Sequence, residues 1–484
     1  MERVLVIGVD GFEPSLLESW MDYLPCIRWL STRGLYAKLR STIPPFTVPA
    51  WNSMFTGVNP GRHGLYGWFK VKFTQENLSL EISTSNKQKF PFLWDELSKR
   101  GLKVGIVNVP VVYPPMKVNG VVVSGLLTPP GACYTYPQSL TNEINRLLGH
   151  EYKILSPMMS VETQKSLLID RVKVSLYLMK KFDWSLFIVV FYILDAIQHT
   201  HWHTLQSKSC KDEAKSKCVI RDFYIFIDRL IGFLIRKVPE NTSIILVSDH
   251  GFGPLKEYFN VNNWLLKQGL LKLDVDVSKG KTLSRIAGPP IKTAVRHHFL
   301  VSRISSLIPD RVKWKLRHLS RLEQGMSYIC KHIDCNQSLA IGVGEMGEIY
   351  IRSDVSRRER ESLINKIIDG LKMASLIGRK RELRIYRREK VYRGLYVRQA
   401  PDVLYSMDEL RCNQKTLIGT GLFQQSLQSG GHRMKGVLIV KPPGENLNFT
   451  GRGEASIYDV TPTIMKLLNV SPKVTYDGSP LIDY

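Results

Sequence analysis

Aspartate and histidine residues with spacings typical of metal ligands occur at several places in the 484-residue chain. Asp195 and His199 are four residues apart, which puts both side chains on one face of a helix. Asp249 and His250 are adjacent, and His432 follows two glycines that let the backbone approach a site closely. Mixed oxygen and nitrogen ligands favour zinc, manganese or iron over calcium. The candidate ligands are Asp10, Asp195, His199, Asp249, His250 and His432.

Each of these signals is also common in ordinary structure, because a histidine in an apolar strand usually belongs to the core and Asp-His-Gly is often only a turn. His201 and His203 are rivals to His199 as ligands, although a polar helix end or a supporting role explains them better. The set of six carries more weight than any one member.

Thr47 supplies a hydroxyl in residues 41–64, STIPPFTVPAWNSMFTGVNPGRHG. The prolines predict a rigid loop that leads into a short helix over residues 51–55. A hydroxyl just before a helix lies near free N–H groups and the positive end of the helix dipole, which favour phosphate. A threonine there is also an ordinary cap. Beside two divalent ions, Thr47 would instead be a nucleophile for phosphoryl transfer, forming a phosphothreonine that water hydrolyses.

Three apolar runs rich in β-branched residues deliver the candidate aspartates. Residues 4–9 precede Asp10, residues 186–193 precede Asp195, and residues 243–247 precede Asp249. Such runs are typical of strands buried on both faces. In open α/β sheets, ligands bind outside the carboxyl ends of the strands. We therefore expect the three carboxylates to lie at one edge of a sheet.

Helical patterns alternate with the apolar runs, which predicts a three-layer αβα sandwich around a mostly parallel central sheet. The predicted helices cover residues 14–34 in two pieces, 91–100, 161–181, 221–236 and 459–468, and further strands cover 104–109, 121–125 and 436–440. Residues 1–254 and 430–484 form the catalytic core. Residues 255–345 are predicted to be an inserted, basic and mainly helical cap, and residues 346–429 a cap or sheet extension with a strand at 347–352 and a charged helix at 356–376.

The chain carries 67 lysines and arginines against 43 aspartates and glutamates, a net charge of +24. This charge attracts polyanions, acidic membrane surfaces or small phosphorylated substrates, and a generally basic solvated surface explains it as well. Seven scattered cysteines favour a reducing interior over a disulfide framework. The longest apolar run, residues 185–194, is about half the length needed to span a bilayer. These observations predict a cytoplasmic protein without a membrane span.

Several segments, taken in order, resemble one protein family. The segments are VLVIGVDG, the residues 41–64 quoted above, FYILDAIQH, IILVSDHGFG, SGGHRMKG and YDVTPTIMKLL. They are similar to the type I phosphodiesterase and nucleotide pyrophosphatase branch of the alkaline phosphatase superfamily, over residues 4–253 and from 430 to the end.

The resemblance implies two divalent metal ions, of which zinc is the usual choice and manganese serves in related mutases. One ion would bind Asp10, Asp249 and His250. Thr47 would be the nucleophile and also a metal ligand. The implied ligands of the second ion are Asp195, His199 and His432.

One position departs from the family pattern. The family has an asparagine that binds a phosphate oxygen where this chain has Trp68. Candidate replacements are Asn52, Arg62, His63 and Arg433, each of which is also explained as a structural or surface residue. An arginine of the basic cap is a further candidate.

We expect a metal-dependent phosphohydrolase that cleaves a phosphodiester or pyrophosphate bond in a small phosphorylated substrate such as a nucleotide. The alternatives are a phosphomonoesterase or phosphomutase on the same scaffold and, in another class, a basic nucleic-acid or membrane-surface binding protein with an inactive site. No stable nucleic-acid partner is expected, since the basic residues 379–393 have the pattern of a solvated amphipathic face. The GVGEMG sequence at 342–347 leads into a strand, so it is not interpreted as a dinucleotide-binding motif.

Overall fold

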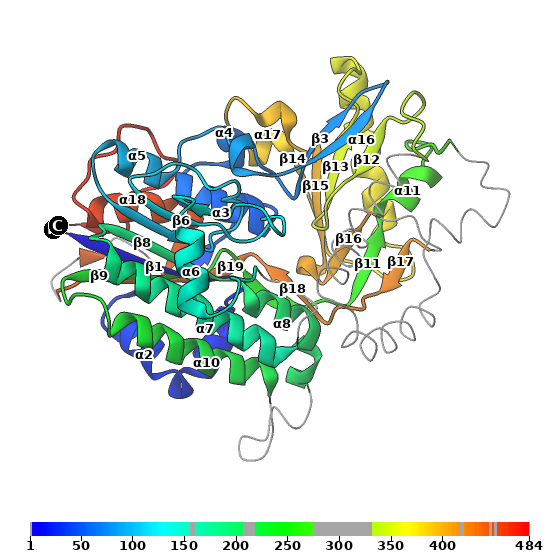
Figure 1. Ribbon diagram of the computed structural model, residues 1–484. Coiled ribbons are helices and arrows are strands. Elements are labelled where there is room, and N and C mark those ends of the chain that lie inside the picture. The colour runs from blue at the N-terminus through cyan, green and yellow to red at the C-terminus, as the bar shows by residue number, and fades with distance from the viewer. Residues whose placement is uncertain are drawn as a thin grey trace.

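The structure is a computed structural model that describes residues 2–154, 160–206, 218–274, 332–416, 421–444, 448–449 and 453–483. Within these residues, a nine-stranded sheet forms the centre of the larger part of the molecule (Figure 1). In spatial order its strands are β21 (Glu454–Ser456), β2 (Leu35–Arg40), β19 (Lys435–Lys441), β9 (Thr242–Val247), β1 (Arg3–Val9), β8 (Leu186–Phe191), β5 (Val104–Val107), β6 (Gly120–Val123) and β7 (Thr135–Tyr136).

The central strands of this sheet are parallel. β1 pairs in parallel with β8 and β9, and β5 continues the parallel set between β8 and β6. β19 is antiparallel to both β9 and β2, and β7 is antiparallel to β6. Val9 is opposite Phe191, and Gly8 is opposite Val247. The chain therefore leaves β1, β8 and β9 at one edge of the sheet, as predicted.

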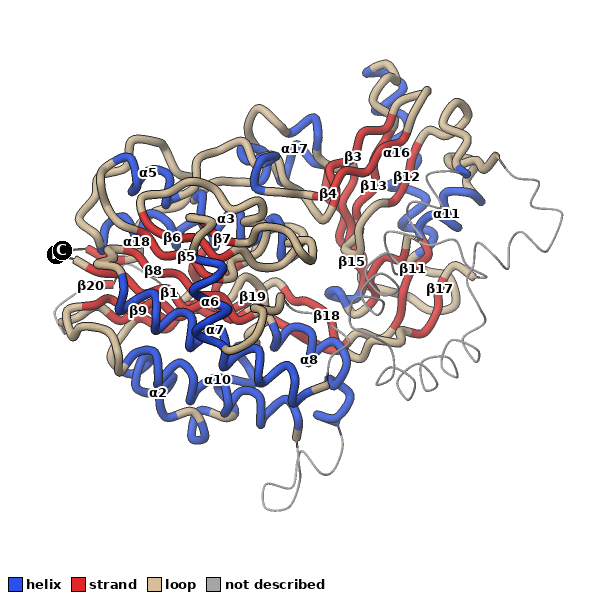
Figure 2. Tube along the Cα trace, in the orientation of Figure 1, coloured by secondary structure: helices blue, strands red, loops and turns tan. Residues whose placement is uncertain are grey.

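Helices cover both faces of the sheet (Figures 1 and 2). Because successive side chains of a strand point to opposite faces, Leu5 and Ile7 of β1 pack in one core while Val4 and Val6 pack in the other. The first core includes α2 (Pro25–Thr32), α7 (Val161–Lys181), α8 (Ile193–His201) and α10 (Val219–Ile235). The second includes α3 (Thr47–Thr56), α5 (Leu93–Lys99) and α18 (Val460–Leu467). The predicted αβα sandwich is confirmed.

A second sheet lies beside the sandwich (Figure 2). Its strands are β12 (Ala340–Gly342), β13 (Glu348–Ile351), β15 (Val403–Met407), β16 (Cys412–Lys415), β11 (Glu257–Asn260) and β17 (Phe423–Gln425), with β14 (Leu383–Arg387) paired to β15. Its core also takes in α11 (Val261–Lys267), α16 (Arg357–Ala374) and the hairpin of β3 (Phe69–Phe73) and β4 (Leu78–Ile82). We call these elements the smaller lobe.

The smaller lobe runs across the predicted boundary between residues 345 and 346, since β11 and β12 share a sheet with β13 to β17. Most of the predicted helical cap, residues 275–331, lies outside the described residues. Its described flanks contain strands as well as α11.

The remaining elements are short, apart from α6. They are α1 (Pro14–Ser19), α4 (Pro60–His63), α6 (Leu140–Leu148), α17 (Arg388–Val391), β10 (Gly251–Pro254), β18 (Gly430–Arg433), β20 (Asn448–Phe449) and β22 (Ile482–Asp483). In the described part of the chain, no helix has both the length and the hydropathy needed to cross a bilayer.

Candidate active site

Asp10 follows β1 directly and is almost fully buried. Its position depends on Trp51 of α3, whose indole Nε1 donates a hydrogen bond of 3.0 Å to Asp10 Oδ2. Gly8 makes room for this indole, because a Cβ at Gly8 would lie 2.5 Å from a ring carbon of Trp51. The remaining oxygen, Asp10 Oδ1, has no hydrogen-bond partner among the described residues. Trp51 thus fixes the carboxylate and leaves one oxygen free for a ligand.

Asp249 and His250 follow β9 and are fully buried. Asp249 Oδ1 accepts a hydrogen bond of 3.3 Å from the backbone N–H of Gly11, which draws the ends of β9 and β1 together. His250 Nε2 lies 3.2 Å from Asp249 Oδ2 and 3.4 Å from Asp10 Oδ1. Asp10, Asp249 and His250 therefore converge, and we call them the first ligand group.

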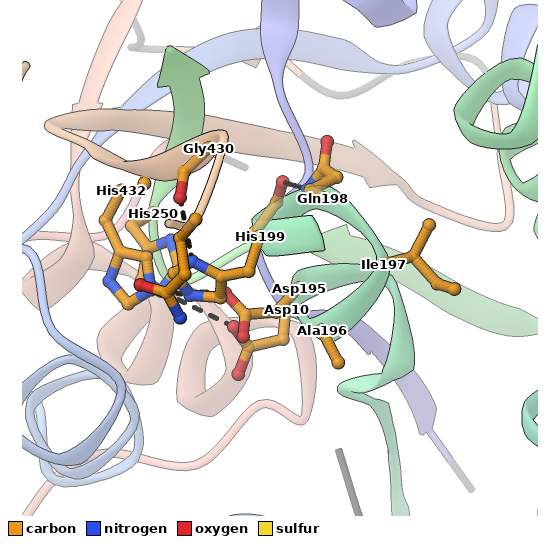
Figure 3. Close-up of polar contacts among 12 residues, drawn as sticks. Asp10, Asp195, Ala196, Ile197, Gln198, His199, His250, Gly430 and His432 are labelled. Carbon is orange, nitrogen blue, oxygen red and sulfur yellow. Dashed lines mark hydrogen bonds and ion pairs between the residues drawn. The ribbon is translucent and has the colours of Figure 1, made fainter. Parts of the chain in front are cut away.

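The second ligand group is Asp195, His199 and His432 (Figure 3). The strand predicted to reach residue 193 ends at Phe191, so Asp195 and His199 both lie on α8 at the predicted four-residue spacing. His432 lies in β18, a strand paired with β10. The Nε2 atoms of His199 and His432 are 3.2 Å apart and lie 3.4 and 3.1 Å from Asp195 Oδ1.

Backbone carbonyls orient all three imidazoles. Nδ1 of His199 lies 2.9 Å from the carbonyl oxygen of Gly430, and Nδ1 of His250 lies 3.0 Å from that of Gly251. Nδ1 of His432 lies 3.0 Å from the carbonyl oxygen of Pro45. A carbonyl can only accept, so a neutral ring in this position carries its proton on Nδ1 and exposes the Nε2 lone pair. The three Nε2 atoms are thereby prepared as ligands.

The two groups fit divalent metal ions. The three donor atoms of the second group are separated by 3.1–3.4 Å, and His250 Nε2 of the first group lies 3.2 and 3.4 Å from its two carboxylate oxygens. These distances are close to the edge of about 3.3 Å that follows from tetrahedral metal–ligand bonds of about 2.0–2.1 Å. Three ligands leave the fourth tetrahedral position open, as in catalytic zinc sites. Four buried donor atoms have no hydrogen-bond partner among the described residues, namely Asp10 Oδ1, Asp195 Oδ1, Asp249 Oδ2 and His250 Nε2.

The pKa shifts of the buried ligands also favour bound cations. Burial and the carboxylate of Asp195 raise the pKa of Asp10 well above its usual value. Burial and the carboxylate of Asp10 do the same for the pKa of Asp249. Burial and the charge of His432 lower the pKa of His250. Ionised carboxylates buried this close to one another are costly without cations, so divalent ions would stabilise them.

Thr47 is the first residue of α3, which begins four residues before the predicted helix, and it is buried. Residues on both sides of Thr47 in the chain contact the ligand groups. The carbonyl oxygen of Pro45 lies beside Nδ1 of His432 in the second group, and the indole N–H of Trp51 donates to Asp10 in the first. Thr47 and Trp51 are four residues apart and share a face of α3. The threonine therefore lies between two residues that contact the ligand groups, at the start of a helix, where the first backbone N–H groups have no partner within the helix.

Comparison with known families gives a match over most of the chain. A family model described as type I phosphodiesterase / nucleotide pyrophosphatase matches residues 4–408. The chain belongs to this family. Bovine ectonucleotide pyrophosphatase/phosphodiesterase family member 3 is 30% identical over 110 residues, which are 21% of this chain and 12% of that protein. Venom phosphodiesterase 2 of Crotalus adamanteus is 27% identical over 123 residues, 24% of this chain and 15% of that protein.

Solved structures show the same fold at low identity. Human ectonucleotide pyrophosphatase / phosphodiesterase 5 aligns with a TM-score of 0.54 and 14% identity, over 99% of this chain and 97% of that chain. Phosphonoacetate hydrolase from Sinorhizobium meliloti 1021, in complex with phosphonoformate, aligns with a TM-score of 0.58 and 14% identity, over 97% and 95%. The αβα sandwich of this family member is thus shared with both of these proteins.

The four candidate phosphate contacts are engaged with protein groups. His63 Nε2 lies 3.0 Å from Ser53 Oγ in the interior, where burial lowers the pKa of the histidine to about 3. Arg62 pairs with Asp477 at 3.1 Å. The guanidinium of Arg433 donates to backbone carbonyls, including that of Leu410 at 3.0 Å.

The last candidate, Asn52, donates to the carbonyl of Val48 at 2.7 Å, and its own Oδ1 has no hydrogen-bond partner among the described residues. These contacts give each of the four a structural role. Trp68, at the position of the family's asparagine, stacks edge to face on Phe46 with ring centroids 5.1 Å apart. An aromatic pair thus stands beside Thr47 in this member of the family.

Sequence reasoning missed two residues of the smaller lobe that reach this region, Glu345 and Met346. Both lie in the GVGEMG sequence, which leads into strand β13 as predicted. Met346 packs in one cluster with Phe46 and Val48, the neighbours of Thr47. The glycines of this sequence predict a tight turn, but they do not indicate which part of the molecule the turn contacts.

Proposed function

We propose that the protein is a metal-dependent phosphohydrolase that cleaves a phosphodiester or pyrophosphate bond through Thr47. The observation that carries this proposal is the convergence of two ligand groups that contact Pro45 and Trp51, on either side of Thr47 in the chain. Family membership supports it. The two curated relatives named above align over only 12% and 15% of their length, so the activity rests on the site and the fold together.

The chain's own residues supply the covalent steps. Oγ1 of Thr47 attacks the phosphorus, and the bond between phosphorus and the leaving oxygen breaks, which leaves a phosphothreonine. Water then attacks the phosphorus, releases the phosphorylated product and restores the hydroxyl. Two divalent ions, when bound, supply a lower pKa for the attacking hydroxyl and neutralise the non-bridging oxygens. The six ligands hold these ions, and the free N–H groups at the start of α3 face the anionic group.

We propose zinc as the metal, with manganese as the alternative, because the ligands combine imidazole nitrogen with carboxylate oxygen. A small phosphorylated substrate such as a nucleotide fits the family, and one structural relative, an inactive variant of the murine phosphodiesterase 5, was solved in complex with AMP. We also propose a cytoplasmic location from the scattered cysteines. Cell fractionation with an antibody to the chain tests that location, and recovery in the medium would contradict it.

The test of the function is a pair of rates on metal-stripped protein to which zinc or manganese is returned. Hydrolysis of bis(p-nitrophenyl) phosphate that is faster than hydrolysis of p-nitrophenyl phosphate supports the proposal. A faster monoester reaction would favour a phosphomonoesterase or phosphomutase. Absence of bound metal together with salt-sensitive polyanion binding would favour the basic binding protein with an inactive site.

A further inference from the structure

The chain that follows Asp10 is fastened to the strand end that carries the rest of the first ligand group. The backbone N–H of Gly11 donates to Asp249 Oδ1 at 3.3 Å, and the backbone N–H of Phe12 donates to the hydroxyl oxygen of Ser248 at 2.9 Å. Ser248 is the residue that separates β9 from Asp249. These two bonds join the ends of β1 and β9, so the first ligand group is one connected unit.

Gln198 connects this unit to α8, the helix that carries Asp195 and His199 (Figure 3). Its side chain is fully buried, and its Nε2 donates a hydrogen bond of 2.7 Å to the carbonyl oxygen of Gly11. In the sequence, Gln198 is next to His199, and Gly11 is next to Asp10. One hydrogen bond thus joins the neighbour of a second-group ligand to the neighbour of a first-group ligand.

Tyr224 of α10 fixes the other end of the Gln198 amide. The tyrosine hydroxyl donates to Gln198 Oε1 at 3.2 Å and accepts a hydrogen bond of 3.0 Å from the backbone N–H of Glu13. Tyr224 is fully buried as well. A rotated amide would place Oε1 against the carbonyl oxygen of Gly11, and two acceptors cannot bond each other. The amide therefore has one orientation, and buried polar groups on both of its sides depend on it.

The packing around Gly11 leaves little room for a shift of α8. Gly11 has a φ of +72°, and a Cβ at this position would lie 3.2 Å from Gln198 Nε2 and 3.5 Å from the Cα atom of Asp195. The ring of Phe252 in β10 packs edge to face on His199, with centroids 4.9 Å apart. The helix α8 therefore lies directly against the first group, and Gln198 makes a hydrogen bond across this contact.

We propose that Gln198 is a positioning residue that sets the separation of the two metal ions, an inference that rests on the proposed function. Two divalent ions act together on one phosphoryl group when they lie about 3.5–4 Å apart. Asp195 and His199 can place the second ion correctly only if α8 keeps a fixed distance from the first group. Gln198 holds that distance through Gly11 and is not a member of either ligand group.

The test loads metal-stripped protein with Mn²⁺, since two Mn²⁺ ions held close together give an EPR spectrum that depends on their separation. Wild-type protein with two Mn²⁺ ions per chain is expected to show the spectrum of a coupled pair. Gln198→Met has a side chain of similar length without the amide, so both hydrogen bonds are lost. We expect this variant to bind two ions, to show weaker coupling, and to lose about tenfold to 100-fold in kcat for bis(p-nitrophenyl) phosphate with little change in KM.

Gln414→Met is the matched control. Gln414 of β16 is also buried, and its amide likewise accepts a hydrogen bond from a tyrosine hydroxyl, that of Tyr405, and lies beside backbone carbonyls of the smaller lobe. A purely structural role of the buried glutamine would destabilise both variants in urea unfolding and leave the Mn²⁺ spectrum of both unchanged. The proposal expects a changed spectrum in Gln198→Met alone.

A folded Gln198→Met protein whose Mn²⁺ spectrum and kcat equal those of the wild type would overturn the inference. If Gln198→Met does not fold, Tyr224→Phe takes its place, because it keeps the amide and removes the hydroxyl that orients it. The same change in the spectrum is then expected to a smaller degree, and an unchanged spectrum would refute the inference. Failure of the proposed function gives a different result, since the wild-type protein would then show no coupled Mn²⁺ pair or would hydrolyse neither bis(p-nitrophenyl) phosphate nor p-nitrophenyl phosphate.

Discussion

The imidazole rings of His250 and His432 stack with their centroids 3.7 Å apart and an angle of 19° between their planes. The two rings belong to different ligand groups, so the stack joins the first group to the second. Two protonated rings at this distance would repel each other, and a backbone carbonyl beside each Nδ1 fixes the orientation of each ring. Burial and the charge of His432 lower the pKa of His250, which favours the neutral form of that ring, the form that binds metal.

Loss of His432 should remove one of the two metal ions. In His432→Ala, the second group keeps Asp195 and His199, which are too few to hold an ion tightly. We expect elemental analysis to show a fall from about two to about one divalent ion per chain and activity to drop about 100-fold or more. His203→Ala is the matched control, because His203 is exposed on the turn after α8. Full metal content in His432→Ala would remove His432 from the site.

Removal of the Thr47 hydroxyl should stop turnover and leave the metals in place. Thr47→Ala is expected to lose about 1,000-fold or more in kcat because no other group forms the covalent intermediate. Thr47→Ser keeps a hydroxyl and should retain measurable activity. Acid quenching during turnover, followed by mass spectrometry of the peptide that contains residue 47, should find a phosphate on the wild-type chain. Unchanged activity in Thr47→Ala would show that water attacks the substrate directly.

Most of the core could be predicted from the sequence because its signals are local. The apolar run before Asp10 is buried on both faces, and the spacing of Asp195 and His199 alone places both on one face of α8. Pro49 predicts a later start of the helix, which would leave Thr47 just outside it. The helix begins at Thr47 instead, because a proline is tolerated in the first turn of a helix.

The smaller lobe was harder to predict because its pairings are distant in the chain. Glu257 of β11 pairs with Cys412 of β16, and strands of four residues carry little pattern of their own. β18 is likewise a strand because it pairs with a distant segment, in which Phe252 lies opposite His432. The position of Glu345 depends on this tertiary pairing and on nothing within the turn itself.

The hydrogen bond from Trp51 to Asp10 should tighten metal binding at the first group. Trp51→Phe keeps an aromatic ring against Gly8 and removes the N–H donor, so Asp10 is less well oriented. We expect metal affinity, measured by competition with a chelator, to weaken about 10-fold to 100-fold. Trp94→Phe is the matched control, since the Nε1 of the buried Trp94 has no hydrogen-bond partner among the described residues. Equal affinities in both variants would show that the hydrogen bond does not matter.

Glu348 should make the stability of the protein depend on pH. Burial raises the pKa of Glu348 from its usual 4.5 to about 8 in the folded state. Between these values the unfolded chain releases the proton while the folded chain keeps it, so the free energy of unfolding falls as pH rises. The slope is about 1.4 kcal/mol per pH unit for one fully linked proton. Below pH 4.5 this contribution is fully present, and above about 8 it is lost.

Glu348→Gln removes this titration and can still accept the hydrogen bond from the N–H of Met346. Urea unfolding of the metal-free protein between pH 5 and 8 should therefore show a smaller loss of stability in the variant than in the wild type. At pH 8 the variant should be as stable as the wild type or more stable, because the wild-type chain pays to keep its carboxyl protonated or to bury its charge. Glu361→Gln, at an exposed site, should leave the slope unchanged. Identical slopes in the wild type and Glu348→Gln would mean that Glu348 titrates normally in the fold.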